Sequence, residues 1–192
     1  MRVEDLVSSH TDRPKPAGNL DGVPGRLRNI AASAVAAAKA GVGQRRSADP
    51  PIGRREGPTV LPSNKVLQAI LKEYSLRSVI DDDGDLAVRW ESFSIYFFHY
   101  GQDAEVLQAR LYLNRRFEVE LRPTLALVLD DWNRSKLFPK AYTVLPDDGL
   151  VGICAEQAFD FEGGISRQQL KFTVGMWLQN LQQFADWTEE HV

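Results

Sequence analysis

The sequence predicts an α+β protein with an antiparallel sheet, built in the order helix, strand meander, helix, β-hairpin, helix. Three observations support this prediction. Apolar residues recur with a helical period in three separate segments, at 63–74, 120–134 and 166–189. Between 86 and 113 they alternate with a period of two, as in strands. The turn sequence Pro146-Asp147-Asp148-Gly149 joins two further strand-like runs, which is typical of a hairpin.

The first helix is predicted from Ser63, a residue type favoured at the N-cap, to about Tyr74. Its apolar side consists of Val66, Leu67, Ile70, Leu71 and Tyr74. A short strand at 79–80 then leads into the acidic turn at 81–84. The alternation of Leu86, Val88 and Trp90 with polar or small residues predicts a half-buried strand after this turn.

The most hydrophobic strand is predicted at 93–100, and its two sides are both apolar. Phe93, Ile95 and Phe97 point one way, and Tyr96, Phe98 and Tyr100 point the other. Because both sides need to be covered, we expect this strand to be central in the sheet, or its second side to meet a partner. The next strand, at 107–113, alternates strictly between apolar and polar residues.

The second helix is predicted from about Glu120 to Arg134, with a proline in its first turn. Asn133 is expected to adopt the left-handed turn that ends this helix. Pro139 then sets the entry into the hairpin, predicted at 140–161. Ser166 and Gln169 form a capping box for the last helix, which is expected to run towards Glu189.

The first 58 residues differ in composition from residues 59–192, so we predict a flexible basic arm followed by one domain. Prolines and glycines interrupt any period in residues 1–23. The Ala-rich segment 24–40 predicts a helix, and its apolar side consists of Leu27, Ile30, Ala31, Ala34, Val35 and Ala38. Residues 43–58 read as a linker that carries two arginine doublets, Arg45-Arg46 and Arg54-Arg55.

The net charge of −3 is divided unevenly along the chain. Residues 1–57 carry ten Lys and Arg against six Asp and Glu, which gives +4, whereas the remainder carries thirteen against twenty, which gives −7. An acidic domain repels nucleic acid phosphates, so nucleic acid is not an expected partner of the domain. No stretch approaches the ~18 consecutive apolar residues of a membrane span. These features predict a cytoplasmic protein.

Several polar groups resemble parts of catalytic or metal sites, but no catalytic, cofactor or metal site is predicted. The acidic run from Asp81 fails the calcium-loop pattern, because position 6 is Leu86 rather than glycine and position 12 is Ser92 rather than glutamate. Asp130 and Asp131 are adjacent, and adjacent helical residues point about 100° apart, so they are expected to be structural.

The single histidine of the aromatic strand and the single cysteine are also assigned structural roles. His99 has no second histidine in a metal-ligand pattern, and no glycine-rich phosphate loop is present. Cys154, the only cysteine, excludes an internal disulfide and lies among small apolar residues of the hairpin. It is expected to pack as a small hydrophobe.

Residues 59–190 resemble the YbjN family of bacterial sensory-transduction regulators. The resemblance is carried by Trp132-Asn133, by Phe138-Pro139-Lys140-Ala141-Tyr142, and by Gly163-Gly164-Ile165-Ser166 with Gln169-Leu170. It covers about two thirds of the chain, and no catalytic signature accompanies these short motifs. The resemblance implies an α+β fold similar to that of type III secretion chaperones, which bind other proteins, commonly as dimers.

The sequence and the resemblance together favour a non-enzymatic, protein-binding regulatory or chaperone-like module. The expected partner is an unidentified protein, with an identical subunit among the candidates. Trp132, Phe138 and Tyr142 are expected to determine the fold first and to supply partner contacts second. The proposed contact residues are Tyr96, Phe98, Tyr100, Trp132, Phe138 and Tyr142. Two alternatives stay open: a small enzyme or ligand-binding domain using Asp130, Asp131 or His99, and an arm that tethers the protein to nucleic acid or an anionic membrane.

Overall fold

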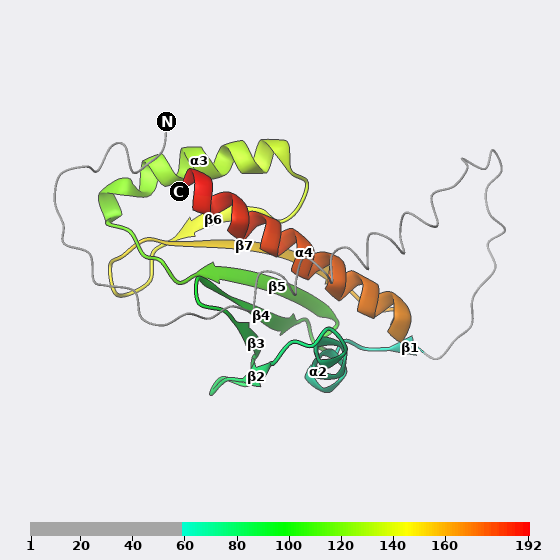
Figure 1. Ribbon diagram of the computed structural model, residues 1–192. Helices are drawn as coiled ribbons and strands as arrows, with labels where there is room; N and C mark the ends of the chain where they lie inside the picture. Colours follow the sequence, from blue (N-terminus) through cyan, green and yellow to red (C-terminus); the bar gives the residue numbers. More distant parts are fainter. Residues whose placement is uncertain (1–58) are drawn as a thin grey trace, which may run out of the picture.

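The computed structural model describes residues 59–192, and its centre is one six-stranded antiparallel sheet (Figure 1). The strands lie in the order β2-β3-β4-β5-β7-β6. Their bounds are β2 Val79–Ile80, β3 Leu86–Arg89, β4 Phe93–Tyr100, β5 Val106–Leu113, β6 Lys140–Val144 and β7 Gly152–Asp160. The predicted meander is thus β2 to β5, and the predicted hairpin is β6 with β7. The hairpin joins the meander through β7, which pairs with β5.

Three α-helices of residues 59–192 complete the described fold: α2 Asn64–Glu73, α3 Arg122–Ser135 and α4 Arg167–His191. A 3-10 turn, η2 Val119–Leu121, precedes α3, so this helix begins two residues later than the periodicity suggested. Ser166 caps α4 as predicted, because its Oγ accepts a hydrogen bond from the Gln169 N–H at 3.2 Å. Ser63 occupies the N-cap position of α2, but its side chain makes no capping hydrogen bond. The predicted α+β class is confirmed.

A second, two-stranded pairing holds the start of the described chain. Strand β1, Thr59–Val60, pairs antiparallel with β8, Ile165–Ser166, directly before α4. The predicted arm at 1–58, including its predicted Ala-rich helix at 24–40, lies outside the described residues. The predicted domain boundary near residue 59 stays a prediction. Among residues 59–192, no helix is long and apolar enough to cross a membrane.

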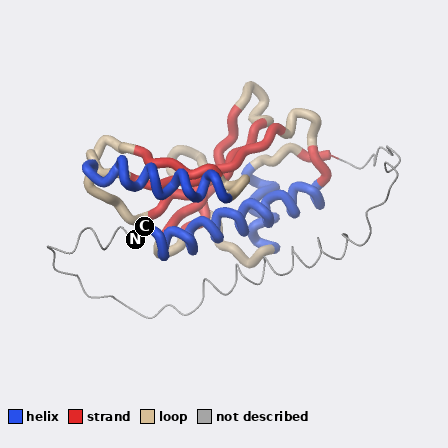
Figure 2. Tube along the Cα trace, turned by 90° about the horizontal axis from the view of Figure 1, so that it is seen from above, coloured by secondary structure: helices blue, strands red, loops and turns tan. Residues whose placement is uncertain are grey.

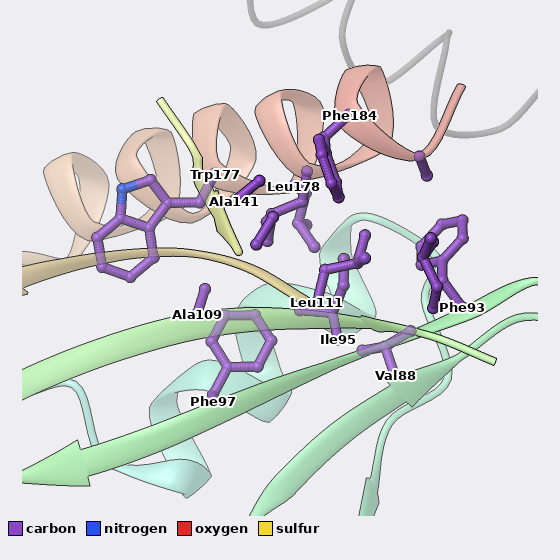
Figure 3. Close-up of a cluster of buried hydrophobic side chains, with 14 of the residues drawn as sticks. Val88, Phe93, Ile95, Phe97, Ala109, Leu111, Ala141, Trp177, Leu178 and Phe184 are labelled. Atoms are coloured by element: carbon purple, nitrogen blue, oxygen red, sulfur yellow. The ribbon is translucent and has the colours of Figure 1, made fainter. Parts of the chain in front are cut away.

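All three helices contribute to one core on one side of the sheet, which we call the inner face. The inward residues of β4 are Phe93, Ile95 and Phe97, and each is at most 3% exposed. They pack with apolar residues of the helices, including Leu178 and Phe184 of α4, and Figure 3 shows strand side chains directed towards that helix. Figure 2 shows the strands lying to one side of α4. The largest fully buried side chains belong to this core.

Helices α2 and α4 approach each other closely at the end of the sheet nearest β1. The Tyr74 hydroxyl, just after α2, donates to the Lys171 carbonyl of α4 at 2.8 Å. Gly175 makes room for this ring, because a Cβ there would lie 2.5 Å from the Tyr74 oxygen. Glu73 adds ion pairs to Arg167 and to Lys171, the latter at 2.7 Å. These contacts fix α2 against α4 on the inner face of the sheet.

Candidate partner-binding face

The side of the sheet opposite the helices carries the strand aromatic residues that the sequence singled out, namely Tyr96, Phe98, Tyr100 and Tyr142. We call it the outer face. The strand registers place on it Tyr96, Phe98 and Tyr100 of β4, Gln108, Arg110 and Tyr112 of β5, Tyr142 of β6, and Cys154 and Glu156 of β7. No helix of residues 59–192 contributes to a core on this side, since every strand residue of the buried cluster belongs to the inner face. Tyr100 and Tyr142 are 47% and 37% exposed.

The aromatic rings of β4 and β5 contact one another along the outer face. Tyr96 stacks on Phe98 with a centroid separation of 5.9 Å, and Phe98 lies 6.3 Å from Tyr100. Tyr112 meets Tyr96 edge to face at 5.8 Å. The Tyr100 hydroxyl donates to Gln108 Oε1 at 3.2 Å. The rings therefore form a continuous surface that their mutual contacts hold in place.

An ion pair lies beside these rings and joins β5 to β7. Arg110 and Glu156 are opposite each other in the strand register, and Arg110 Nε donates to Glu156 Oε2 at 2.6 Å. The guanidinium also lies 5.4 Å from the Phe98 ring and 5.9 Å from the Tyr112 ring. Its Nη1 donates to the Tyr112 hydroxyl at 3.1 Å. Arginine held by both a carboxylate and two rings gives the face a fixed polar centre.

Tyr142 connects the edge strand β6 to the same carboxylate. Its hydroxyl donates to Glu156 Oε2 at 2.6 Å. Burial raises the pKa of Tyr142, and the hydrogen bond to the Glu156 carboxylate raises it further, because both favour the neutral phenol. The proton on this phenol is therefore held to a higher pH than that of a free tyrosine.

Cys154 lies beneath these groups and is fully buried. Burial is the main cause that raises the pKa of its thiol to about 11. The thiolate is the nucleophilic form, so this cysteine is unreactive near neutral pH. Its role is to pack under the outer face, as the sequence predicted.

The Trp-Asn and Phe-Pro-Lys-Ala-Tyr motifs fasten α3 to the edge strand β6. The Trp132 indole N–H donates to the Pro139 carbonyl at 2.9 Å, and its ring is only 2% exposed against Phe184 and Trp187. Lys140 Nζ donates to the carbonyls of Asn133 and Lys136 at the end of α3. Trp132 is thus a core residue, which agrees with its expected role in the fold and removes its ring from the exposed surface. Phe138 is 50% exposed.

Asn133 does not adopt the left-handed turn that the sequence suggested. It lies within α3, and no left-handed φ occurs there. Its side chain instead makes hydrogen bonds to the backbone of β6 at the edge that faces away from β7. Nδ2 donates to the Ala141 carbonyl at 2.8 Å, and Oδ1 accepts from the Ala141 N–H at 2.9 Å. The amide replaces the two hydrogen bonds that a further strand would make to Ala141, and the helix ends two residues later, at Ser135.

Two of the three residues of the alternative enzyme hypothesis, Asp130 and His99, have separate structural partners. Asp130 forms an ion pair with Arg134 one turn further along α3. His99 points to the inner face, where its Nε2 lies 3.0 Å from Asn64 Oδ1, and burial lowers its pKa. Asp131 is exposed on α3. The structure does not bring these groups together into one site.

The acidic run after β2 forms a turn. Asp81 Oδ1 accepts hydrogen bonds from the N–H groups of Asp83 and Asp85, at 3.1 and 2.8 Å. Within residues 59–192 there is no group of three or more His, Cys, Asp or Glu side chains arranged to hold a metal ion.

Sequence reasoning did not single out Arg110, Tyr112 or Glu156. Arg110 and Tyr112 were visible as the polar phase of the alternating strand, on the side opposite its leucines. Their meeting with Glu156 depends on β5 pairing with β7 rather than with its sequence neighbour β6. Only that pairing reveals the ion pair at the centre of the outer face.

The fold and the motif contacts agree with a comparison against protein families. Residues 63–190 match the YbjN family, described as "Putative bacterial sensory transduction regulator". The chain belongs to this family and is a regulatory protein module of that description. The family is described as a regulator rather than as an enzyme.

A solved structure has the same fold. The crystal structure of YbjN, described as a putative transcription regulator from E. coli, is similar with a TM-score of 0.56 and 16% sequence identity. The similarity covers 66% of this chain and 90% of that one. At this identity the likeness shows the fold alone. No curated protein matches the chain. The likeness to type III secretion chaperones stays a prediction.

Proposed function

We propose that this chain is a non-enzymatic regulatory module whose outer face binds another protein. The observation that carries the proposal is a fixed aromatic surface that no helix of residues 59–192 covers. Aromatic and arginine side chains are the residue types that dominate the binding energy of protein interfaces. The contact residues we propose are Tyr96, Phe98, Tyr100 and Tyr142, with the Arg110–Glu156 pair among them.

The arrangement of these residues favours a protein partner over a small molecule. The rings lie along a sheet surface and contact each other, so they present a broad area rather than a pocket. The charges of Arg110 and Glu156 are already paired, so a partner need not neutralise them. A partner strand or helix laid across the face would remove apolar ring surface from water, which is the main source of association energy. Phe138, exposed at the β6 edge, would extend this contact.

A capture experiment with matched variants tests the proposal. The immobilised full chain is incubated with native lysate of its source bacterium, in the wild-type form and with Phe98→Ala and Tyr100→Ala together. The control carries Phe172→Ala and Met176→Ala, which remove exposed apolar side chains from α4 on the other side of the sheet.

The expected result is a near-stoichiometric protein that wild type and control retain and that the outer-face variant loses. Equal recovery by all three forms would show that the partner binds elsewhere. Recovery of no protein by any form would remove the support for an adaptor role in the cytoplasm. Light scattering on the purified chain identifies the case in which the retained protein is a second copy.

A further inference from the structure

The sheet has one strongly charged end, and three of its connections meet there. In the register, Leu86 pairs with Phe97, Tyr100 pairs with Val106, and Val106 pairs with Asp160. The β2–β3 turn, the β4–β5 turn and the end of β7 therefore lie at the same end of the sheet. We call this the acidic end, because it carries Asp81, Asp82, Asp83, Asp85, Asp103, Glu105, Asp160 and Glu162.

No lysine or arginine of residues 59–192 forms an ion pair with these eight carboxylates. Nearby cations are used elsewhere: Arg167 and Lys171 pair with Glu73. On the outer face itself, Arg110 pairs with Glu156, and Arg89 lies opposite Ser94 at the other end of the sheet. Asn64 contacts the β2–β3 turn, so the next residue, Lys65, lies near the acidic end. Lys65 supplies one positive charge against the eight carboxylates. The acidic end thus has an excess of negative charge.

The described chain begins at this same end. Strand β1 pairs with β8, which follows β7 after the short segment 161–164. The Phe161 N–H also donates to the Glu105 carbonyl at 2.9 Å, so this segment is tied to the β4–β5 turn. Residues immediately before Thr59 therefore start next to the acidic end.

The order of features along residues 24–58 matches their order on the surface. Arg54 and Arg55 lie four or five residues before Thr59, within about 18 Å along an extended chain. Further from Thr59, towards the N-terminus, come Arg45 and Arg46 and then the apolar stripe of segment 24–40. Residues 41–58 can extend up to ~60 Å, whereas a domain of this size has a radius of gyration of about 14 Å. The chain is therefore long enough for the apolar stripe to contact the aromatic rings while the arginines contact the carboxylates.

We infer that residues 24–58 of the same chain bind the outer face, with the arginine doublets against the acidic end and the apolar stripe of 24–40 over the tyrosine rings. This inference rests on the proposed function, because it makes the arm and the partner compete for one surface. A tethered segment acts at an effective concentration in the millimolar range, so a weak contact suffices to hold it. The small alanine side chains of the stripe bury little area, so a partner with larger apolar residues displaces it.

Hydroxyl-radical footprinting of the full chain tests this inference. The reactivity of Tyr96, Phe98 and Tyr100 is measured in wild type, in Arg54→Glu with Arg55→Glu, and in Arg13→Glu with Lys15→Glu. Both variants change the charge by −4, but only the first lies in the segment proposed to bind. An exposed ion pair shifts an equilibrium by up to about fivefold, so the first variant should raise the reactivity of the three rings about threefold or more. Phe172 and Met176 of α4 serve as internal controls.

Three results would overturn the inference. Equal reactivity of the three rings in all forms means that the arm does not cover them. An equal rise in both variants means that the effect is a general one of charge, without a specific segment. Protection that appears only as the protein concentration rises means that a second copy occupies the face. In each case the capture experiment with Phe98→Ala and Tyr100→Ala still decides separately whether the face binds a partner.

Discussion

The two sides of β4 are nearly equal in hydrophobicity and opposite in surroundings. Phe97 is fully buried beneath the helices, whereas its neighbour Phe98 is half-buried on the outer face, beside Tyr96 and Arg110. The inner face is stabilised by dense apolar packing. The outer face is stabilised by rings that contact each other and by an arginine that lies between them. Apolar character alone therefore does not distinguish a core from a binding surface, but the partners of each ring do.

The largest predicted effect comes from the same substitution made on each side. Phe97→Ala should lower the free energy of unfolding by ~3–5 kcal/mol, because it leaves a cavity in the core. Phe98→Ala should cost only about 1 kcal/mol, the value of its ring contacts, and should abolish partner capture. Urea denaturation of both variants measures the difference. Similar losses of stability would mean that the two faces are not distinct.

A smaller effect is expected at the sheet edge beside the outer face. Asn133→Ala removes both hydrogen bonds to Ala141 and should lower the free energy of unfolding by ~1–3 kcal/mol, since two backbone groups lose their partners. Asn133→Asp keeps the acceptor for the Ala141 N–H but places a carboxylate oxygen against the Ala141 carbonyl, which it repels. Its loss should therefore be at least as large. Urea denaturation again gives the values, and an Asn133→Asp variant as stable as wild type would contradict the role of both bonds.

The polar centre of the outer face gives a prediction at high pH. Because the pKa of Tyr142 is raised above the ordinary value near 10 in the folded state, its contribution to stability is complete below pH 10. That contribution is lost as the pH rises further, since the unfolded chain ionises first. Glu156→Gln should lower the Tyr142 pKa towards the ordinary value and cost about 1–2 kcal/mol near neutral pH.

Ultraviolet titration of tyrosinate measures this change. Tyr142→Phe is the control, because it removes the late-titrating phenol and leaves the other tyrosines in place. In wild type, the tyrosine that is missing from Tyr142→Phe should titrate later than the others. If it instead titrates near pH 10, then the Glu156 contact does not hold the phenol proton.

The smallest effect concerns the helices that cover the inner face. Hydrogen bonds from Lys171 and Arg167 lower the pKa of Glu73 to about 2 from 4.5. A lowered pKa contributes stability above pH 4.5 that is lost as the pH falls towards 2. Glu73→Gln should therefore be less stable than wild type at neutral pH, with the difference shrinking through this range. Thermal unfolding at several pH values measures it, and a difference that is constant with pH would exclude this origin.

The local parts of the fold were predictable because each depends on neighbouring residues. The alternation in β4 and β5, the Asp81 turn and the Ser166 cap all appear where the residue pattern placed them. The burial of Cys154 also follows from its apolar neighbours. The sequence even showed that β4 has two apolar sides, which is the basis of the candidate site.

The parts that escaped prediction depend on pairings between distant segments. Asn133 is a common helix-ending residue, and nothing local indicates that Ala141 will lie within reach of its amide. Glu156 is unremarkable until β7 lies beside β5 and faces Arg110. Trp132 could be assigned to core or surface only once α4 supplied Phe184 and Trp187 as neighbours.

The side chain of Asn133 has a consequence for how copies of this chain could join. Proteins polymerise through their sheets when each subunit offers two unpaired edges, one to receive a strand and one to be received. Here the β6 edge is occupied at Ala141 by the protein's own Asn133 amide, while β2 is paired only with β3 within the described chain. Joining through backbone hydrogen bonds of the six-stranded sheet would consume its single remaining edge, β2, in each copy. Such an assembly would therefore close at two subunits and could not grow into a fibre.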